Sequence, residues 1–350
     1  MTGNGHRDYL RIATEEAFAP PEVISEWRGL LERGDIDPGF ASLWGFFLTT
    51  RAERPQNVVA RLQDLGERRL SDMDFTGIDK QIISLTAPGT QIFDTDRATG
   101  IATLANDQLA DACRAHPDRF AGLTAVAPQD PDAAAKEIER GVTQLGFNGV
   151  IINSHTHGEY LDNQKFWPIL EAAEAQDVPI YLHPNTPSRG LIGPIVEQRL
   201  DGAIYGFAVE TGLHLLRMIV AGVFDRFPRL RLVVGHLGEA LPFWLYRLDY
   251  MYASRVSGRG GQSVELLPSE YLKRNVWITT SGMAWEPAIQ FTRQVLGGDR
   301  VMYAMDYPYE FEADEVRTHD ELALTAGERR ELFQGIAERV FKLDTAAAKG

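Results

Sequence analysis

The sequence predicts a (β/α)8 barrel, an α/β fold in which eight parallel strands alternate with helices. Two observations support this prediction: short β-branched runs recur along the 350 residues, and each is followed by a longer amphipathic stretch. An open nucleotide-binding sheet is the main alternative, but no GxGxxG motif follows the first expected strand. The barrel is therefore the expected architecture.

Several expected strands are continuously apolar, as in GVIIN, VPIYLHP and LRLVVGH, which is typical of parallel strands covered on both faces. Helical periodicity occupies the intervals, notably at 57–75, 99–116, 132–145 and 166–176. In chain order, the strands are expected near 9–16, 79–85, 119–127, 147–153, 177–183, 229–236, 274–280 and 300–306.

No change of composition marks a second domain, so residues 1–350 are expected to form one barrel. Two connections are longer than a barrel requires. Residues 19–56 carry the aromatic cluster Trp44, Phe46 and Phe47, and residues 184–228 follow the fifth strand. Both are candidate lids or subunit contacts, although extra packing around the barrel explains either one equally well.

Composition excludes several classes of function. A net charge of −14 disfavours nucleic acid and anionic membrane as partners, and an anionic substrate would need local arginines. Cys113 is the only cysteine, on an expected helix face, and is read as an inert buried thiol. The opening MTGNGHRDYL lacks an apolar targeting segment, and no later apolar run is long enough to span a bilayer; a cytoplasmic enzyme is expected.

Polar residues that can bind a metal stand at the ends of four expected strands. They are Glu15 in RIATEEAF, His183 in VPIYLHP, His236 in LRLVVGH and Asp306 in RVMYAMDYP. A single strand-end histidine is more often structural, but strand ends of a barrel converge on one axis. The joint pattern therefore predicts one site, in which three groups bind a metal and a fourth acts on a substrate.

The donor types favour one divalent ion. Glu15, His183 and Asp306 offer two carboxylates and one imidazole, a set suited to Mn²⁺, Zn²⁺ or Mg²⁺. The first strand reads Glu15, Glu16, Ala17 where hydrolases of this type usually open with His-x-His, and the fourth ends at Asn153 without a bridging lysine. A mononuclear site and chemistry other than hydrolysis are therefore expected.

Other histidines are assigned to the loops and the core. His155 and His157 follow the fourth strand in a polar loop, where contact with substrate or support of the loop is favoured over metal binding. His214 lies on an apolar helix face and is expected in the core or an interface. Glu239, three residues after His236, is expected to orient that histidine or to begin a helix.

The stretches RIATEEAFAPPE, LGERRLSDMDFTGIDKQIISLTAPG, VVGHLGEALPFWLYRLDYM and VMYAMDYPYE resemble the aromatic acid decarboxylases of the amidohydrolase superfamily. The resemblance extends from about Tyr9 to Leu343. It is strongest to the members that act on 5-carboxyvanillate and weaker to those for γ-resorcylate and 2,3-dihydroxybenzoate. Ala17 departs from the γ-resorcylate members, which have histidine there, but agrees with the EEAF form of the others.

The resemblance implies roles for particular residues. Glu15, His183 and Asp306 match the family's metal ligands, with Mn²⁺ preferred, and His236 matches the histidine beside the substrate. Arg54 and Arg247 match arginines that bind the acid's carboxylate groups, one of them across a subunit interface. Thr86 and Tyr309 match residues that line the substrate pocket. Without the resemblance, Arg54 is read as a loop cap, Arg247 as a surface ion pair with Asp249, and Tyr309 as packing.

The expected reaction is metal-dependent, non-oxidative decarboxylation of an ortho-hydroxylated aromatic acid, with Asp306 as proton donor and His236 assisting. A homodimer or homotetramer is expected from the apolar stretch near 205–225 and the tryptophan-containing stretch 243–250. The alternative function is a metal-dependent hydrolase or hydratase for a lactone or dicarboxylate. A catalytically inactive binding module is a third reading, disfavoured because all four strand-end groups are present.

Overall fold

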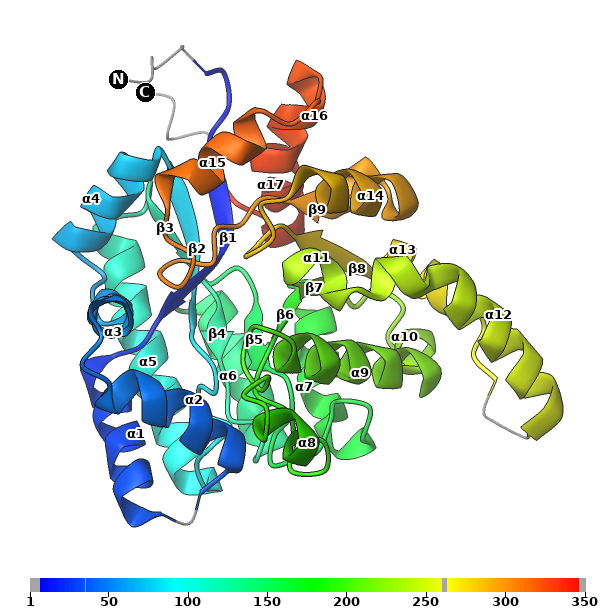
Figure 1. Ribbon diagram of the computed structural model, residues 1–350, viewed down its shortest axis with the longest axis horizontal. Coiled ribbons are helices and arrows are strands. Elements are labelled where there is room, and N and C mark those ends of the chain that lie inside the picture. The colour runs from blue at the N-terminus through cyan, green and yellow to red at the C-terminus, as the bar shows by residue number, and fades with distance from the viewer. Residues whose placement is uncertain (1–6, 35, 260–262, 346–350) are drawn as a thin grey trace.

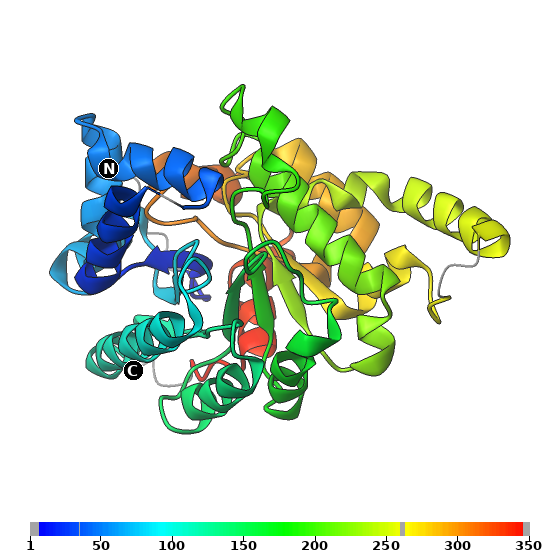
Figure 2. The same cartoon turned by 90° about the horizontal axis from the view of Figure 1, so that it is seen from below.

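Parallel strands form the centre of the molecule and helices surround them (Figures 1 and 2). The computed structural model describes residues 7–34, 36–259 and 263–345. Within these residues the strands occupy all eight expected positions, as the barrel prediction requires. They are β1 Ile12–Phe18, β2 Lys80–Leu85, β3 Phe120–Gly122, β4 Thr124–Ala125, β5 Val150–Asn153, β6 Ile180–His183, β7 Leu232–Val234, β8 Val276–Thr279 and β9 Val301–Met302.

The expected third strand is divided into β3 and β4 at Leu123. The ladder runs β1-β2-β3 on one side and β4 to β9 in chain order on the other. Leu123 bridges the two parts: its N–H donates to Ile83 O at 2.9 Å, while Thr124 N donates to Gly149 O at 2.8 Å. At the other junction, Ala17 N donates to Tyr307 O at 2.7 Å and joins β1 to the segment after β9.

Helices form the outer layer. They are α1 Pro21–Arg33, α2 Pro38–Thr49, α3 Glu53–Leu62, α4 Glu67–Thr76, α5 Thr95–Ala115, α6 Pro131–Thr143, α7 Trp167–Ala175, α8 Ile192–Val196, α9 Gly206–Val220, α10 Val223–Arg226, α11 His236–Glu239, α12 Leu241–Arg259, α13 Pro268–Asn275, α14 Glu286–Leu296, α15 Ala313–Asp320, α16 Ala326–Arg330 and α17 Ile336–Phe341, with short helices η1 Gln164–Phe166, η2 Gly298–Arg300 and η3 Glu331–Gly335. Among the described residues, none of these helices has both the length and the apolar composition needed to cross a bilayer.

Local sequence signals explain where the barrel helices begin. The Asp130 side chain accepts a hydrogen bond from Ala133 N, and Pro131 opens α6, because proline has no N–H to leave unpaired there. The Asp94 side chain caps α5 in the same way, through Arg97 N at 3.0 Å. Both helices then turn an apolar face toward the strands.

Two expected strand ends differ in the structure. Glu15 lies inside β1, because the strand starts at Ile12 rather than near residue 9 and continues to Phe18. Asp306 lies in the loop beyond β9, because Tyr303 N donates to Leu332 O at 2.9 Å and leaves the ladder. Both side chains still reach the same point of the barrel, since one donor atom of each lies within 4.8 Å of the other and of His183.

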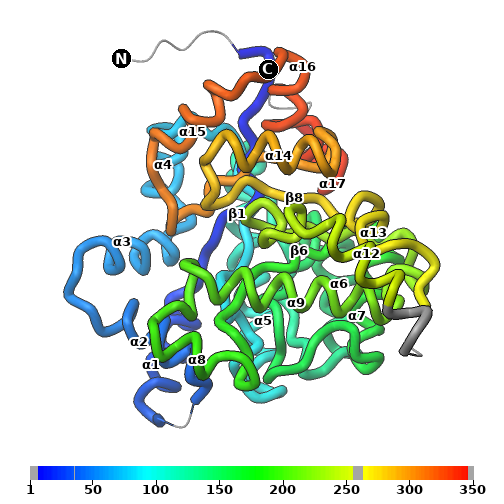
Figure 3. The backbone as a smooth tube through the Cα atoms, turned by 45° about the vertical axis from the view of Figure 1, so that its right-hand side comes forward, coloured from blue at the N-terminus to red at the C-terminus, as the bar shows by residue number. Residues whose placement is uncertain are grey.

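The two long connections carry helices and lie against each other. Residues 19–56 form α1, α2 and the start of α3, and residues 184–228 form α8, α9 and α10. Figure 3 shows α2 beside α8. Gly39 of α2 permits this approach, because a Cβ there would lie 2.2 Å from the hydroxyl oxygen of Thr186.

His214 in α9 makes stability depend on pH. Burial lowers its pKa to about 3 from 6.5, with repulsion from His155 and Arg217 adding to the shift. Its Nε2 accepts a hydrogen bond from Leu161 N at 2.9 Å, which only the neutral ring can do. Since the folded-state pKa is lowered, the associated stability is present above pH 6.5 and is lost as the pH falls toward 3.

We therefore expect the free energy of unfolding to fall by up to about 1.4 kcal/mol per pH unit across this window on account of His214. In the variant His214→Gln, the amide oxygen can accept the same hydrogen bond but does not titrate. Chemical denaturation at a series of pH values should show a shallower loss for the variant. Equal slopes for both proteins would contradict the assignment.

Candidate metal centre and active site

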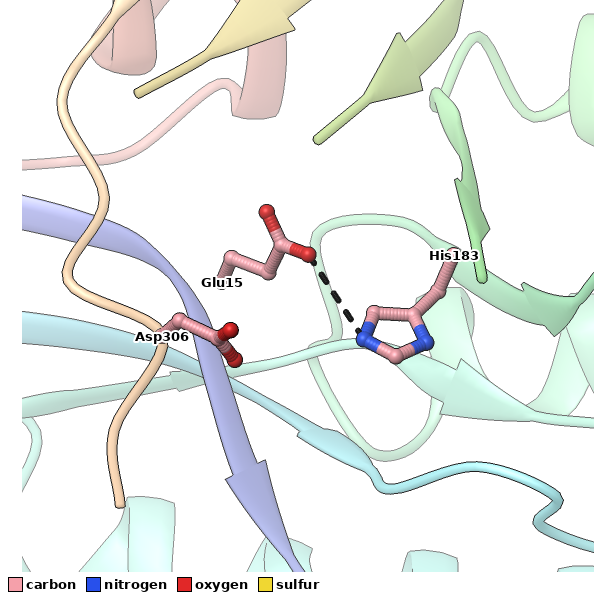
Figure 4. A group of neighbouring side chains, drawn as sticks. All are labelled: Glu15, His183 and Asp306. Atoms are coloured by element: carbon pink, nitrogen blue, oxygen red, sulfur yellow. Dashed lines mark ion pairs between the residues drawn. The ribbon is translucent and has the colours of Figure 1, made fainter. Parts of the chain in front are cut away.

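Three donor side chains meet inside the barrel end. Glu15 comes from β1, His183 from the end of β6 and Asp306 from the loop after β9, and their side chains point toward one another (Figure 4). One donor atom from each lies within 4.8 Å of the others. Segments far apart in sequence therefore place two carboxylates and one imidazole around a single point.

The Glu15 carboxylate is held by one oxygen and offers the other. Its Oε2 accepts hydrogen bonds from the hydroxyl groups of Tyr181, Thr279 and Ser281. Its Oε1 is buried and has no hydrogen-bond partner among the described residues. Burial alone would raise the pKa of Glu15, but His236, His183 and the hydroxyl donors together lower it. Glu15 is thus an ionised carboxylate with one oxygen left for a cation.

His183 is oriented as a nitrogen ligand. Its Nδ1 lies 2.8 Å from Pro184 O, an oxygen that can only accept, so the proton is on Nδ1. The Nε2 lone pair then faces Glu15 Oε1 at 3.5 Å. A backbone carbonyl that fixes the tautomer in this way is the usual support for a metal-binding histidine.

Asp306 occupies an unusual backbone conformation. Its φ angle is +68°, in the left-handed region that side-chain-bearing residues rarely adopt. Burial raises the pKa of its carboxyl group, although His236 opposes the shift. A carboxyl group with a raised pKa keeps its proton to a higher pH than an exposed carboxyl group does, which favours a role as a proton donor.

These donors fit a divalent cation. Two carboxylates and one imidazole suit Mn²⁺, Zn²⁺ or Mg²⁺, and the unpartnered Glu15 oxygen would be costly to bury without a cation beside it. His155 and His157 lie outside the metal-binding group that the described residues form. Their rings contact the carbonyl oxygens of Thr186 and Phe93 instead, and so they support loops.

His236 lies beside the three ligands. Its Nδ1 is 2.8 Å from Glu239 Oε1, while its Nε2 is 3.7 Å from both Glu15 Oε1 and Asp306 Oδ2. Burial alone would lower the pKa of His236, but Glu239, Glu15 and Asp306 together raise it well above its usual range. Glu239 therefore orients a protonated imidazole toward the centre.

Three of the four groups, His183, His236 and Asp306, line a cavity of about 500 Å³, a size suited to a small organic molecule, and Glu15 lies next to them. Both long connections contribute apolar walls. The lining residues are Leu43, Trp44, Phe46, Phe47, Ala52, Arg54, Pro55, Val58, Thr86, Ala87, His183, Ala203, Phe207, His236, Asp306, Tyr309 and Glu310.

Three of the four expected substrate-binding residues line this cavity. The Thr86 and Tyr309 hydroxyl groups are 2.8 Å apart, and the Arg54 guanidinium donates to Tyr309 O at 3.3 Å. The fourth, Arg247, does not line the cavity within the described chain. It is exposed on α12, which extends away from the barrel (Figure 1).

Sequence reasoning missed several cavity residues, among them Glu310 and Phe207, and it misjudged the burial of Cys113. Glu310 faces Arg54 at 3.9 Å, and it could have been suspected because it closes the motif MDYPYE. Phe207 belongs to a helix in the second insertion, where no local signal marks it. Cys113 is half-buried rather than buried, and burial raises its pKa to about 12, so the thiol stays protonated.

Comparison with known proteins places the chain in a family. Residues 56–343 match the amidohydrolase family model. The chain is 35% identical to the γ-resorcylate decarboxylase of Rhodococcus jostii, over 95% of this chain and 99% of that protein.

Solved structures give the same relationship. The chain is 53% identical to 5-carboxyvanillate decarboxylase from Novosphingobium aromaticivorans, complexed with manganese and 4-hydroxy-3-methoxy-5-nitrobenzoic acid, with a TM-score of 0.95 over 97% of each chain. The corresponding values for 5-carboxyvanillate decarboxylase from Sphingomonas paucimobilis are 40% and 0.92, over 96% of this chain and 100% of that one. The chain therefore belongs to the amidohydrolase family, among relatives that are aromatic acid decarboxylases.

Proposed function

We propose that this protein is a carboxy-lyase that removes CO₂, without oxidation, from an ortho-hydroxylated aromatic acid of the 5-carboxyvanillate type. It would use one divalent ion, Mn²⁺ by preference, and act in the cytoplasm in the breakdown of aromatic acids such as those released from lignin. The observation that carries the proposal is the convergence of Glu15, His183 and Asp306, with His183, Asp306 and His236 lining a cavity of about 500 Å³. The manganese complex of the 53% identical relative supports it.

Glu15, His183 and Asp306 would hold the ion. When bound, it supplies Lewis-acid stabilisation to the phenolic oxygen and carboxylate of the substrate. The apolar wall formed by Phe47 and Phe207 excludes water and stacks on the aromatic ring. Arg54, whose guanidinium is at the cavity mouth, would attract a second anionic group of the acid.

Proton transfer is assigned to the side chains at the base. Asp306 delivers a proton to the ring carbon that bears the carboxylate, which avoids an aryl carbanion. The bond from that carbon to the carboxylate then breaks, its electron pair restores the aromatic ring, and CO₂ leaves. Asp306 regains a proton from solvent, and His236, 3.7 Å from Asp306 Oδ2, assists this return.

A direct assay tests this function. The Mn²⁺-loaded protein is incubated with 5-carboxyvanillate, γ-resorcylate and 2,3-dihydroxybenzoate, and CO₂ release is followed for each. In D₂O the product should carry one deuterium at the vacated ring carbon. Incorporation of water oxygen into a lactone or dicarboxylate, with no CO₂ from any acid, would instead support the hydrolase or hydratase alternative.

We also propose that the active unit is a homo-oligomer in which Arg247 serves the site of a neighbouring copy. Phe243, Tyr246, Arg247 and Tyr250 are spaced so that they share one face of α12. Their aromatic members are 74%, 83% and 63% exposed, a large apolar area for a free surface. A second copy of the chain would cover this face and would receive an arginine that its own cavity lacks.

The arrangement predicts that two subunits with different defects complement each other. Arg247→Ala should raise KM for the aromatic acid by about 10- to 100-fold, the cost of one charge-assisted contact. Co-expression of Arg247→Ala with Asp306→Asn subunits should restore low KM turnover, because a mixed pair contains one complete site. Hybrids no more active than the sum of the two parent variants would contradict a role for Arg247 in the site of a neighbouring copy, and an unchanged KM in Arg247→Ala would place Arg247 outside the site.

A further inference from the structure

Glu16 is buried beside the metal centre, and neither metal binding nor proton transfer uses it. We infer that Glu16 is a positioning residue, which holds the backbone on both sides of Asp306 and so places the Asp306 carboxylate opposite Glu15 and His183. The expected effect of a Glu16 replacement on turnover rests on the proposed function. The expected effect on metal affinity rests only on the geometry of Glu15, His183 and Asp306.

The contacts of Glu16 bracket Asp306. Glu16 Oε1 accepts a hydrogen bond from Met305 N at 3.1 Å, and Oε2 accepts one from Tyr307 N at 3.2 Å. One carboxylate thus binds the residues immediately before and after the metal ligand. Because one side chain accepts hydrogen bonds from both Met305 and Tyr307, it limits rotation of the backbone at Asp306 between them.

A β-bulge makes the arrangement possible. Ala13 pairs with Gln81 and Glu16 with Ile83, so β1 has one more residue than β2 across this interval. In a regular strand Glu15 and Glu16 would face opposite sides. Here both side chains are buried, Glu15 with its carboxylate at the metal centre and Glu16 with its carboxylate at the loop after β9.

Glu16 is itself anchored by a buried polar chain. Gln81 Nε2 donates to Glu16 Oε2 at 3.3 Å, and Gln81 Oε1 accepts from the Arg69 guanidinium at 3.1 Å. Arg69 also donates to Ala17 O at 2.7 Å and lies 4.6 Å from the centroid of the Tyr307 ring. Both Glu16 and Arg69 are completely shielded from solvent, so their contacts are not weakened by water.

The backbone of Asp306 needs such support. Its φ of +68° is unfavourable for a residue with a side chain and persists only where surrounding contacts determine it. Besides the two Glu16 contacts, Ala17 N binds Tyr307 O at 2.7 Å. Without the two hydrogen bonds to Glu16, the loop would relax toward a negative φ at Asp306. The Asp306 carboxylate would then move away from Glu15 and His183.

The test variant is Glu16→Gln, which keeps the size of the side chain but replaces one acceptor oxygen with a donor. We expect its Mn²⁺ dissociation constant, measured from the electron paramagnetic resonance signal of free Mn²⁺, to rise by about 10- to 100-fold. The spectrum of the bound ion should change as well. At saturating Mn²⁺, kcat should fall while KM for the aromatic acid stays close to the wild-type value.

Asn106→Leu is the matched control. Asn106 is also buried and binds both backbone groups of Ala125 at 2.8 Å, but it does not line the cavity. The Asn106→Leu substitution should lower the melting temperature of the protein without changing its Mn²⁺ affinity. Gln81→Met, which removes one hydrogen-bond partner of Glu16, should reproduce the effects of Glu16→Gln more weakly. If Glu16→Gln does not fold, Gln81→Met serves as the test variant in its place.

Wild-type Mn²⁺ affinity and bound-ion spectrum in both Glu16→Gln and Gln81→Met, with only a lower melting temperature, would overturn the inference. If the wild-type protein binds Mn²⁺ but releases no CO₂ from any acid tested, only the proposed function fails. The affinity measurements on the variants would remain interpretable in that case.

Discussion

Replacing Asp306 by asparagine is expected to lower kcat for CO₂ release by about 10³-fold or more. A loss of this size is what removal of a general acid usually causes. The amide keeps the size of the side chain and an oxygen that can face the ion, but it has no acidic proton to give to the ring carbon. Binding of the aromatic acid should persist, because Arg54, Thr86 and Tyr309 still line the cavity.

The measurement pairs turnover with binding. Steady-state CO₂ release gives kcat, and calorimetric titration with the acid gives affinity for the variant loaded with Mn²⁺. Asp72→Asn is a suitable control, since Asp72 has the same 15% exposed side chain and binds the Tyr307 hydroxyl at 2.8 Å outside the cavity. Turnover in Asp306→Asn close to that of Asp72→Asn would require another proton donor.

Loss of turnover in Asp306→Asn does not by itself distinguish a decarboxylase from a hydrolase or hydratase. The identity of the product must therefore be determined as well. In a hydrolase or hydratase Asp306 would activate water, and its loss would also stop the reaction. Only the decarboxylase places solvent hydrogen on the ring carbon that loses CO₂. Deuterium at that position in the wild-type product, together with a rate of formation of this product that is about 10³-fold lower in the variant, ties the role of Asp306 to decarboxylation.

The four polar groups of this region could be predicted to lie together because each stands at the end of an expected strand. Barrel topology brings the ends of parallel strands together, so the sequence alone groups Glu15, His183, His236 and Asp306. The structure places them side by side. Even where the strand limits differ, as for Asp306 beyond β9, the polar side chain remains at the same end of the barrel.

Other features depend on geometry that residue patterns do not encode. The β-bulge that buries both Glu15 and Glu16 arises from pairing between β1 and β2, which periodicity within β1 does not reveal. Phe207 lines the cavity from the first turn of α9, a contact that depends on how the second long connection packs against the barrel. Arg247 can be matched to a family arginine, but the site that it would serve depends on a second copy of the chain.

Removal of the metal is expected to have the other largest effect. Dialysis against a chelator should reduce CO₂ release to background, and one equivalent of Mn²⁺ per chain should restore it. The reason is electrostatic: without a cation, the carboxylates of Glu15 and Asp306 face each other in a buried site, and the anionic substrate meets no positive charge at the base beyond His236. Mn²⁺, Zn²⁺ and Mg²⁺ added separately would rank the ions.

A control separates loss of metal from loss of fold. The Glu15 Oε1 atom lacks a hydrogen-bond partner among the described residues, so the centre without metal should be destabilised but the barrel should persist. Circular dichroism should therefore remain unchanged after chelation, while the melting temperature falls and recovers with Mn²⁺. Full activity in protein shown by elemental analysis to contain no metal would contradict both the ion and the roles given to Glu15 and His183. In that event the raised pKa of His236 would make its imidazolium the remaining positive group at the base of the cavity.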